Sequence, residues 1–254
     1  MKRIGANVYG AAALLLGTTV ALSGDFATNW QPVPENAAGH TLLVFAGAAL
    51  LIGGGLAVQG HRTRRAGGAV LALIFLAFAL LWARRVVGFP QILATWLGTA
   101  EELALVLGGC ALFVPSLVRS EWQAAASRAL RIGFGLCALI FGAAHFAYVK
   151  QTAAMVPAWL PPSADFWAYA TGVGHAAAGA ALVTGVLALL AARLLTLMFL
   201  VFQILVWVPQ LVQRGGEPMA WGGNGVNLAL VGAAWIIAEL VEARTERHPA
   251  AEAE

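Results

Sequence analysis

The chain has 254 residues, of which 60% are hydrophobic and only 11% are charged, and its formal net charge is +3. Soluble domains are about 45–50% apolar and about 25% charged, so this composition excludes an ordinary soluble globular protein. Basic residues in such a chain are interpreted first as topology signals. We therefore predict the lipid bilayer, and no nucleic acid, as a partner.

A helix that spans a bilayer needs about 20 mostly apolar residues. The sequence offers about eight such segments, at roughly 6–23, 40–59, 67–90, 97–117, 131–150, 166–190, 192–213 and 223–243. They leave no room for a sizeable soluble domain. We predict an all-α, polytopic membrane protein with a single membrane domain over residues 1–254, of which 244–254 form a polar, disordered tail.

The first segment has a second interpretation. Lys2-Arg3, a short apolar run and Ala21-Leu22-Ser23 before Gly24 imitate a signal peptide with its cleavage site. An internal repeat favours a retained helix, because this segment has a counterpart later in the chain.

Residues of about 6–117 and about 131–243 resemble each other. An even number of helices in each copy gives both copies one orientation, so we predict two tandem, parallel four-helix repeats. The matches are Tyr9-Gly10 and Gly17 with Phe134-Gly135 and Gly142, Gly39-His40 with Gly174-His175, Arg84 with Gln203, and Trp96, Gly98 and Glu102 with Trp221, Gly223 and Asn227.

The basic residues are distributed unevenly over the two sides of this topology. With the N-terminus inside, only Arg84, Arg85, Lys150 and Arg214 of the 15 basic residues fall on the extracytoplasmic side. Cytoplasmic loops carry an excess of Lys and Arg. We therefore predict that both chain ends lie in the cytoplasm.

Ionisable groups at membrane depth cost several kcal/mol unless they are paired or face a cavity, so each is a candidate site residue. Because the repeat matches Arg84 and Glu102 with Gln203 and Asn227, we predict two polar pairs. Arg84 would bind Glu102 or its neighbour Glu101, and Gln203 would form an amide–amide hydrogen bond with Asn227. The alternative is that the arginines extend to the membrane interface without a specific partner.

His145 and Tyr148 are three residues apart and share a helix face. Together with His175 and His40, they are candidate hydrogen-bond partners of a quinone carbonyl or another polar head group, although structural hydrogen bonds explain them equally well. We predict no metal site, because the histidines lie on different helices without an i,i+4 pair. Haem ligation by His145 and His175 stays open.

The segment from Thr152 to Tyr169 is rich in proline and aromatic residues, including Trp159. Its composition predicts a cap lying at the membrane interface over the fifth and sixth helices, which would close an outer pocket. Trp159 is therefore a further candidate ligand-binding residue. The alternative is an aromatic belt that anchors the protein at the head groups.

Residues 145–185 are similar to members of the DoxX-like family of small four-helix membrane proteins, and the similarity is clearest over about 134–190. It is carried by His145 and Tyr148, the sequence Val156-Pro157-Ala158-Trp159-Leu160-Pro161, then Gly172, His175 and Gly179. The family takes its name from a subunit of a thiosulfate:quinone oxidoreductase. The resemblance implies a multi-pass protein of a bacterial or archaeal cytoplasmic membrane, with quinone as candidate cofactor and other membrane or periplasmic redox subunits as candidate partners.

An autonomous enzyme is not expected. Cys110 and Cys137 stand alone in apolar segments, and the chain has no CxxC motif, flavin fingerprint or Fe–S spacing. Three functions therefore stay open: a quinone-binding or redox-associated membrane subunit, a small-molecule or lipid carrier, and a structural or assembly partner of a membrane or periplasmic enzyme. The catalytic residues are unknown.

Overall fold

The computed structural model describes residues 4–245, and every regular element within them is helical. The first half contains α1 (Ile4–Ser23), α2 (His40–Gln59), α3 (Arg64–Gly88), α4 (Leu93–Ala111) and the 3₁₀ turn η1 (Val114–Ser116). The second half contains α5 (Ser120–Ala147), α6 (Val149–Ala153), α7 (Ala164–Thr184), α8 (Ala188–Phe202), the π-helical η2 (Gln203–Trp207), α9 (Val208–Arg214) and α10 (Pro218–Thr245).

Seven helical segments within residues 4–245 are long and apolar enough to cross a membrane: α1, α2, α3, α4 with η1, α5, the continuous α8–η2–α9, and α10. The protein is thus a multi-pass membrane protein. The predicted span 166–190 corresponds to α7, which has 21 residues but is not among the seven. Its many Gly and Ala residues and its polar residues, among them His175, lower its hydropathy.

Apolar segments and helices do not end at the same residues. α5 begins at Ser120, well before the apolar segment predicted from 131, and its first turns carry Glu121 and Arg128. These polar residues are compatible with a helix outside the hydrocarbon layer. At the other end of the chain, Arg244 and Thr245 of the predicted tail belong to α10, and the rest of that tail lies outside the described residues.

The ends of α7 follow from local chemistry. The Ser163 side chain accepts a hydrogen bond from the Phe166 backbone N–H at 3.2 Å, and Asp165 lies in the first turn, where the helix dipole favours negative charge. The helix ends at Gly185, whose φ of 88° is readily adopted only by glycine. Ser163 and Gly185 thus mark the start and the end of the helix that carries His175.

Glycine pairs bring helices into backbone contact in both halves. A Cβ on Gly10 of α1 would lie 2.8 Å from the Gly55 carbonyl oxygen of α2, and one on Gly135 of α5 would lie 2.9 Å from the Gly179 carbonyl oxygen of α7. Close approach at small residues is a usual way for helices to associate in membranes. The α1–α2 and α5–α7 pairs therefore pack through equivalent contacts.

A second correspondence lies at the third and fourth helices of each half. Gly98 of α4 packs against the Trp82 ring of α3, and Gly223 of α10 packs against the Trp207 ring. The spacing between tryptophan and glycine is the same in both halves. An alignment on these contacts pairs Trp82 with Trp207 and does not support the predicted match of Arg84 with Gln203.

The predicted match of His40 with His175 does not fit the helix positions either. His40 is the first residue of α2, whereas His175 lies in the middle of α7. The Gly-His dipeptide occurs twice, but the helix contacts show that its two copies occupy different places. Short motifs in apolar helices align easily by chance, and packing contacts decide between the alignments.

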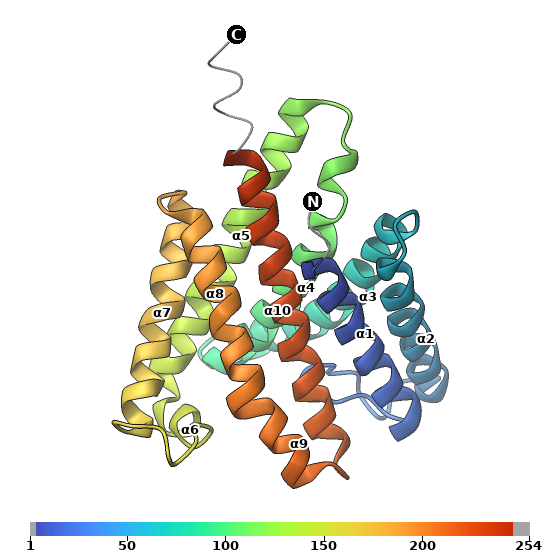
Figure 1. The fold of residues 1–254 in the computed structure, drawn as a ribbon. Coiled ribbons are helices and arrows are strands. Elements are labelled where there is room, and N and C mark those ends of the chain that lie inside the picture. The colour runs from blue at the N-terminus through green and yellow to red at the C-terminus, as the bar shows by residue number, and fades with distance from the viewer. Residues whose placement is uncertain (1–3, 246–254) are drawn as a thin grey trace.

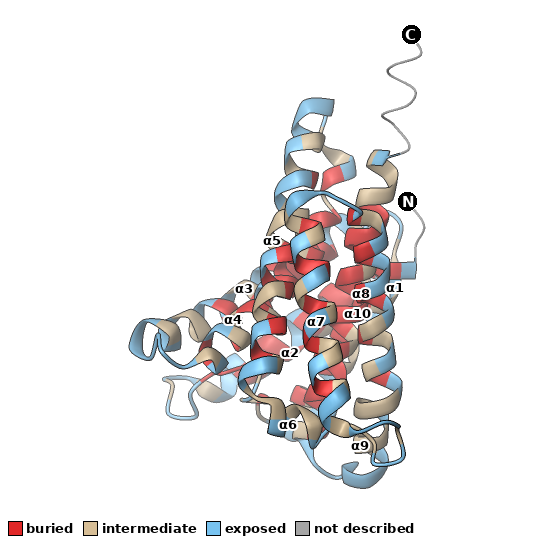
Figure 2. Ribbon diagram, turned by 90° about the vertical axis from the view of Figure 1, so that its left-hand side faces the viewer, coloured by how far each residue is buried: buried red, intermediate tan, exposed pale blue. Residues whose placement is uncertain are grey.

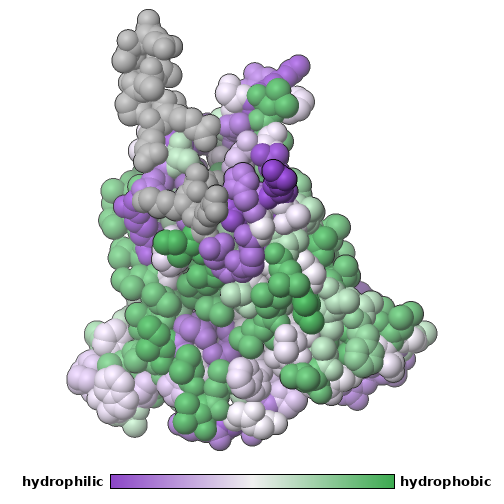
Figure 3. Space-filling view, turned by 45° about the vertical axis from the view of Figure 1, so that its right-hand side comes forward, coloured by the Kyte–Doolittle hydropathy of each residue, from purple (hydrophilic) through white to green (hydrophobic). Residues whose placement is uncertain are grey.

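The helices form a bundle in which α10 lies between α1 and α8 and carries much of the buried surface (Figures 1 and 2). α1 begins and α10 ends at one end of the bundle, while α6 and α9 lie at the other (Figure 1). α3 and α4 lean outward from the remaining helices (Figure 2). Hydrophobic residues form a broad band across the face shown in Figure 3, with hydrophilic residues gathered above it.

The glycine contact between α1 and α2 generates a stability prediction. Gly55→Ala should lower the free energy of unfolding by about 1–3 kcal/mol, because the new Cβ would lie 2.7 Å from the Gly10 carbonyl oxygen. Gly53→Ala on the same helix is the control, since its Cβ would meet nothing within 4 Å. Thermal and chemical unfolding in detergent measures both, and equal stability of the two variants would contradict the packing described.

Candidate functional site

A cavity of about 810 Å³ lies between α4 of the first half and α5, α7, α8 and α10 of the second. Its lining is mostly apolar and includes the rings of Trp30, Trp82, Trp167 and Trp207. A cavity of this size and composition is typical of sites for small lipophilic molecules. It is the candidate functional site.

Two predicted histidines lie side by side on the cavity wall. The ring centroids of His145 on α5 and His175 on α7 are 4.8 Å apart, and the rings are tilted by 39°. His175 is 1% exposed, whereas His145 is partly buried. A Cβ on Gly172 would lie 3.0 Å from the His145 Cβ, so the close approach of α5 and α7 brings the imidazoles together.

Both imidazoles are oriented by their own helices. His145 Nδ1 lies 2.9 Å from the Phe141 carbonyl oxygen, and His175 Nδ1 lies 3.0 Å from the Thr171 carbonyl oxygen. A carbonyl oxygen only accepts, so Nδ1 carries a proton and donates it in each bond. In the neutral ring this leaves Nε2 as a hydrogen-bond acceptor. The wall therefore presents two neighbouring acceptors.

Three phenylalanine rings surround the histidines. His175 has Phe141, Phe199 and Phe202 at centroid distances of 5.8, 5.6 and 6.0 Å. His145 stacks on Phe202 at 6.2 Å with an interplanar angle of 20°. The pair is thus a small polar patch within an aromatic surface.

Tyr148, at the junction of α5 and α6, links the two halves. Its hydroxyl oxygen accepts a hydrogen bond from the Ala94 backbone N–H at 3.0 Å. Ala94 lies in the first turn of α4, where backbone N–H groups have no partner within the helix. The hydroxyl proton of Tyr148 remains available to an acceptor in the cavity.

The predicted ion pair of Arg84 with Glu101 or Glu102 is wrong. Arg84 is exposed near the end of α3, and none of the ion pairs within residues 4–245 joins it to either glutamate. Glu102 is 1% exposed, and both of its carboxyl oxygens lack a hydrogen-bond partner among the described residues. An outward-extending guanidinium does not reach a carboxyl group in the core. Glu101, in contrast, lines the cavity.

The predicted hydrogen bond between Gln203 and Asn227 is confirmed. The Asn227 amide donates to Gln203 Oε1 at 2.8 Å and to the Phe199 carbonyl oxygen at 3.0 Å, and the Gln203 amide donates to Asn224 Oδ1 at 2.6 Å. Gln203 is the first residue of the π-helical η2, and π-helical turns are frequent at functional sites. The network fixes this turn beside the cavity, which Asn227 lines.

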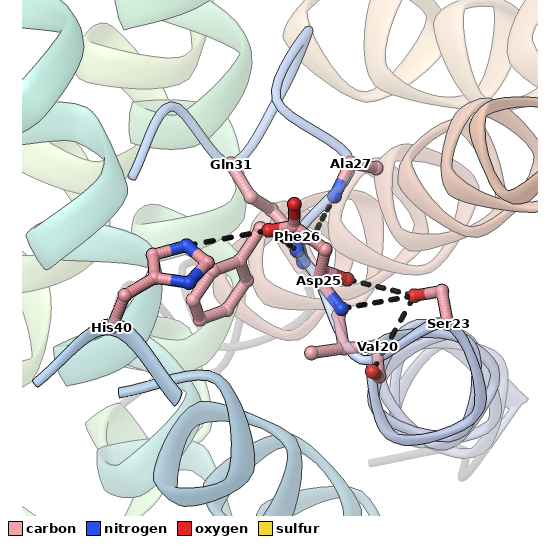
Figure 4. A network of polar contacts seen from close by, with 7 residues as sticks. All are labelled: Val20, Ser23, Asp25, Phe26, Ala27, Gln31 and His40. Atoms are coloured by element: carbon pink, nitrogen blue, oxygen red, sulfur yellow. Dashed lines mark hydrogen bonds and ion pairs between the residues drawn. The ribbon is translucent and has the colours of Figure 1, made fainter. Parts of the chain in front are cut away.

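His40 and Trp159 lie outside the cavity. His40 Nε2 is 3.3 Å from Asp25 Oδ1, at an ion-pair distance that brings the start of α2 to the loop after α1 (Figure 4). Trp159 is 69% exposed, although its neighbours Pro157 and Leu160 line the cavity. The predicted cap over the cavity is therefore formed by other residues of the same segment.

The histidine pair does not fit a haem. Two axial ligands must approach the iron from opposite faces of the porphyrin, and ring centroids 4.8 Å apart leave no space for a porphyrin between them. Within residues 4–245, no three His, Cys, Asp or Glu side chains gather in a way that could hold a metal ion. The donor set instead suits an organic ligand that forms hydrogen bonds.

Of the predicted site residues, the structure brings His145, Tyr148, His175, Glu101 and Asn227 to one cavity. The aromatic lining was not predicted. The three-residue spacing of Phe199 and Phe202 places both on one face of α8, but phenylalanine at helical spacing in an apolar segment does not distinguish a cavity wall from ordinary core.

Comparison with known proteins gives one match. Residues 134–238 match a family described as a domain of unknown function (DUF8561). The matched range begins within α5 and ends within α10, so it covers the four-helix unit of the second half, including the histidine pair. No curated protein and no solved structure matches the chain.

The amide network generates the second prediction. Asn227→Leu should lower the free energy of unfolding by about 1–3 kcal/mol, because Gln203 Oε1 and the Phe199 carbonyl oxygen each lose a donor in a buried place. A double-mutant cycle with Gln203→Leu should give a coupling energy of about 0.5–2 kcal/mol, the range for hydrogen bonds between membrane helices. Strictly additive effects on unfolding would show that the two amides do not interact.

Proposed function

We propose that this cavity binds a quinone, or a lipophilic ring compound of similar size, and that the protein is a quinone-binding or redox-associated membrane subunit. The observation that carries the proposal is the pair of adjacent imidazoles, 4.8 Å apart, on an aromatic wall of a cavity of about 810 Å³. Pockets that bind such molecules combine an apolar lining with a few placed polar groups.

Each group on this wall has a role in binding. The Tyr148 hydroxyl would donate to a ligand oxygen, and the two histidines would accept from a hydroxyl of the reduced ligand. Phe199 and Phe202 provide apolar surface for a ring, and α6 with its following loop limits access of water. A bound quinone would supply two-electron, two-proton redox chemistry, while these residues bind it and orient its oxygens.

The resemblance of residues 134–190 to the DoxX-like family supports the same assignment. Three of the residues that carry the resemblance, His145, Tyr148 and His175, line the cavity. We therefore extend the proposal to a bacterial or archaeal cytoplasmic membrane, with membrane or periplasmic redox subunits as partners. An assembly role without a ligand would not require a cavity of this size.

We further propose that α7 is an eighth spanning helix and that the chain consists of two parallel four-helix repeats. The equivalent glycine contacts support the repeat, as does the contact of Gly108 with Ala233, which stand at matching positions of α4 and α10. Contact between equivalent residues is expected on a two-fold axis. α1 begins and α10 ends at the same end of the bundle (Figure 1), which requires an even number of spans.

Binding of a quinone should stabilise the protein and quench the fluorescence of the cavity tryptophans. Titration with decylubiquinone should raise the free energy of unfolding by about 2.7 kcal/mol at one hundred times the dissociation constant. Ala170→Phe should abolish both effects, because Ala170 lines the cavity and a phenyl ring there would occupy the ligand's space.

The matched control is Ala180→Phe on the same helix, an exposed position outside the cavity lining. It should bind decylubiquinone as the unaltered protein does. If decylubiquinone neither stabilises the protein nor quenches its fluorescence, or if both variants respond equally, the proposed function is wrong.

The orientation is tested by cysteine labelling from outside the cell. In a background carrying Cys110→Ala and Cys137→Ala, Ser163→Cys should react with a membrane-impermeant maleimide, whereas His61→Cys should react only after the membrane is opened. Both positions are exposed, and they lie at opposite ends of the bundle. The excess of arginine at the His61 end supports a cytoplasmic location for that end. The reverse labelling pattern would invert the topology.

A further inference from the structure

We infer that the cavity selects a ligand that donates a hydrogen bond from a ring hydroxyl, so that a phenol or quinol binds more tightly than the corresponding ether or quinone. The inference deepens the proposed function and rests on it for the place where the ligand binds. It follows from counting donors and acceptors around the histidine pair.

Three donor side chains that line the cavity are already used within the protein. The Thr171 hydroxyl donates to the Trp167 carbonyl oxygen at 2.7 Å, and the Trp167 indole donates to the Pro161 carbonyl oxygen at 2.8 Å. The Asn227 amide donates to the Phe199 carbonyl oxygen and to Gln203 Oε1. Each donor proton of these groups is therefore already used in a hydrogen bond within the protein, and none is left for a ligand carbonyl.

The acceptors, in contrast, are unoccupied. Both Nδ1 protons point to helix carbonyls, and no hydrogen bond within residues 4–245 reaches Nε2 of His145 or His175. Charging both rings would place like charges side by side in an apolar cavity, which is unfavourable. Two neutral rings therefore offer two acceptors, and Glu101, which lines the same cavity, adds a carboxyl group without an ion-pair or hydrogen-bond partner among the described residues.

Tyr148 refines the choice of ligand. Its hydroxyl is a donor one helical turn from His145, so a ligand oxygen near both groups would accept from Tyr148 and donate to an imidazole. A phenolic hydroxyl does both, because it has one proton and two lone pairs. A quinone carbonyl or a methyl ether accepts from Tyr148 but leaves the imidazole nitrogens without a donor.

The first half shows that packing alone does not require histidine at these positions. Val20 lies three residues after Gly17, and His145 lies three residues after Gly142. Gly17 contacts Ile52, and Gly142 contacts Ala176. Leu51 directly precedes Ile52, just as His175 directly precedes Ala176. Val20 and Leu51 are 1% and 0% exposed. Equivalent places in the same packing arrangement are thus filled by aliphatic side chains, and the two acceptors are specific to the second half.

The test compares ligands that differ in a single donor. Tryptophan quenching measures the binding of para-nonylphenol and of its methyl ether to the whole chain in lipid nanodiscs. Decylubiquinol and decylubiquinone are compared in the same way under anaerobic conditions. Each hydroxyl form should bind roughly tenfold more tightly than its partner, the effect of about one hydrogen bond. His145→Val and His175→Leu, which introduce the residues of the first half, should reduce this ratio toward one.

Cys137→Ala is the control, because Cys137 is buried on α5 but does not line the cavity. It should keep the full preference. If a histidine variant does not fold, the ligand pairs on the unaltered protein still decide: equal binding of phenol and ether, or tighter binding of the ether, overturns the inference. Preference for the phenol without binding of either quinone form supports the inference and overturns the quinone assignment. Binding of none of the four compounds overturns both.

Discussion

Polar atoms at membrane depth have no water to bind, so they must find partners within the protein. This constraint explains the arrangement of the polar side chains on the inner helix faces. Gln203, Asn224 and Asn227 satisfy one another and a helix carbonyl, and each imidazole satisfies its Nδ1 through the preceding turn of its own helix. The polar atoms left over are informative, because a structural role does not account for them.

Several of these unpartnered groups lie close together. Glu101 and the two imidazole nitrogens meet at the cavity between the halves, and Glu102 lies buried beside Glu101. The helix packing creates this place. Glycine contacts bring α5 and α7 into backbone contact, while α4 of the first half forms another part of the wall and is joined to the second half through Tyr148 and Ala94. The cavity lies where the two halves face each other, and the side chains that the two halves contribute there are different.

Much of the helical organisation could be predicted from the sequence, because apolar segments of spanning length have few alternative structures. Helix ends such as that of α5 at Ser120 were missed, since hydropathy detects the membrane segment and not the helix. Candidate polar residues could also be identified, but their partners could not. Gln203 and Asn227 do bond, whereas Arg84 and Glu102 do not, because pairing depends on how each helix is rotated and no periodicity in these apolar helices reports that rotation.

The two halves separate what packing requires from what a ligand requires. Gly10 with Gly55 and Gly135 with Gly179 make the same kind of backbone contact, which supports the proposed repeat. Val20 and Leu51 complete the first half with apolar side chains, while His145 and His175 place two acceptors at the corresponding positions of the second. A buried acceptor without a donor is destabilising, and the first half demonstrates that the fold can avoid that cost. Two adjacent acceptors on an aromatic wall are therefore better explained by a ligand than by the stability of the bundle.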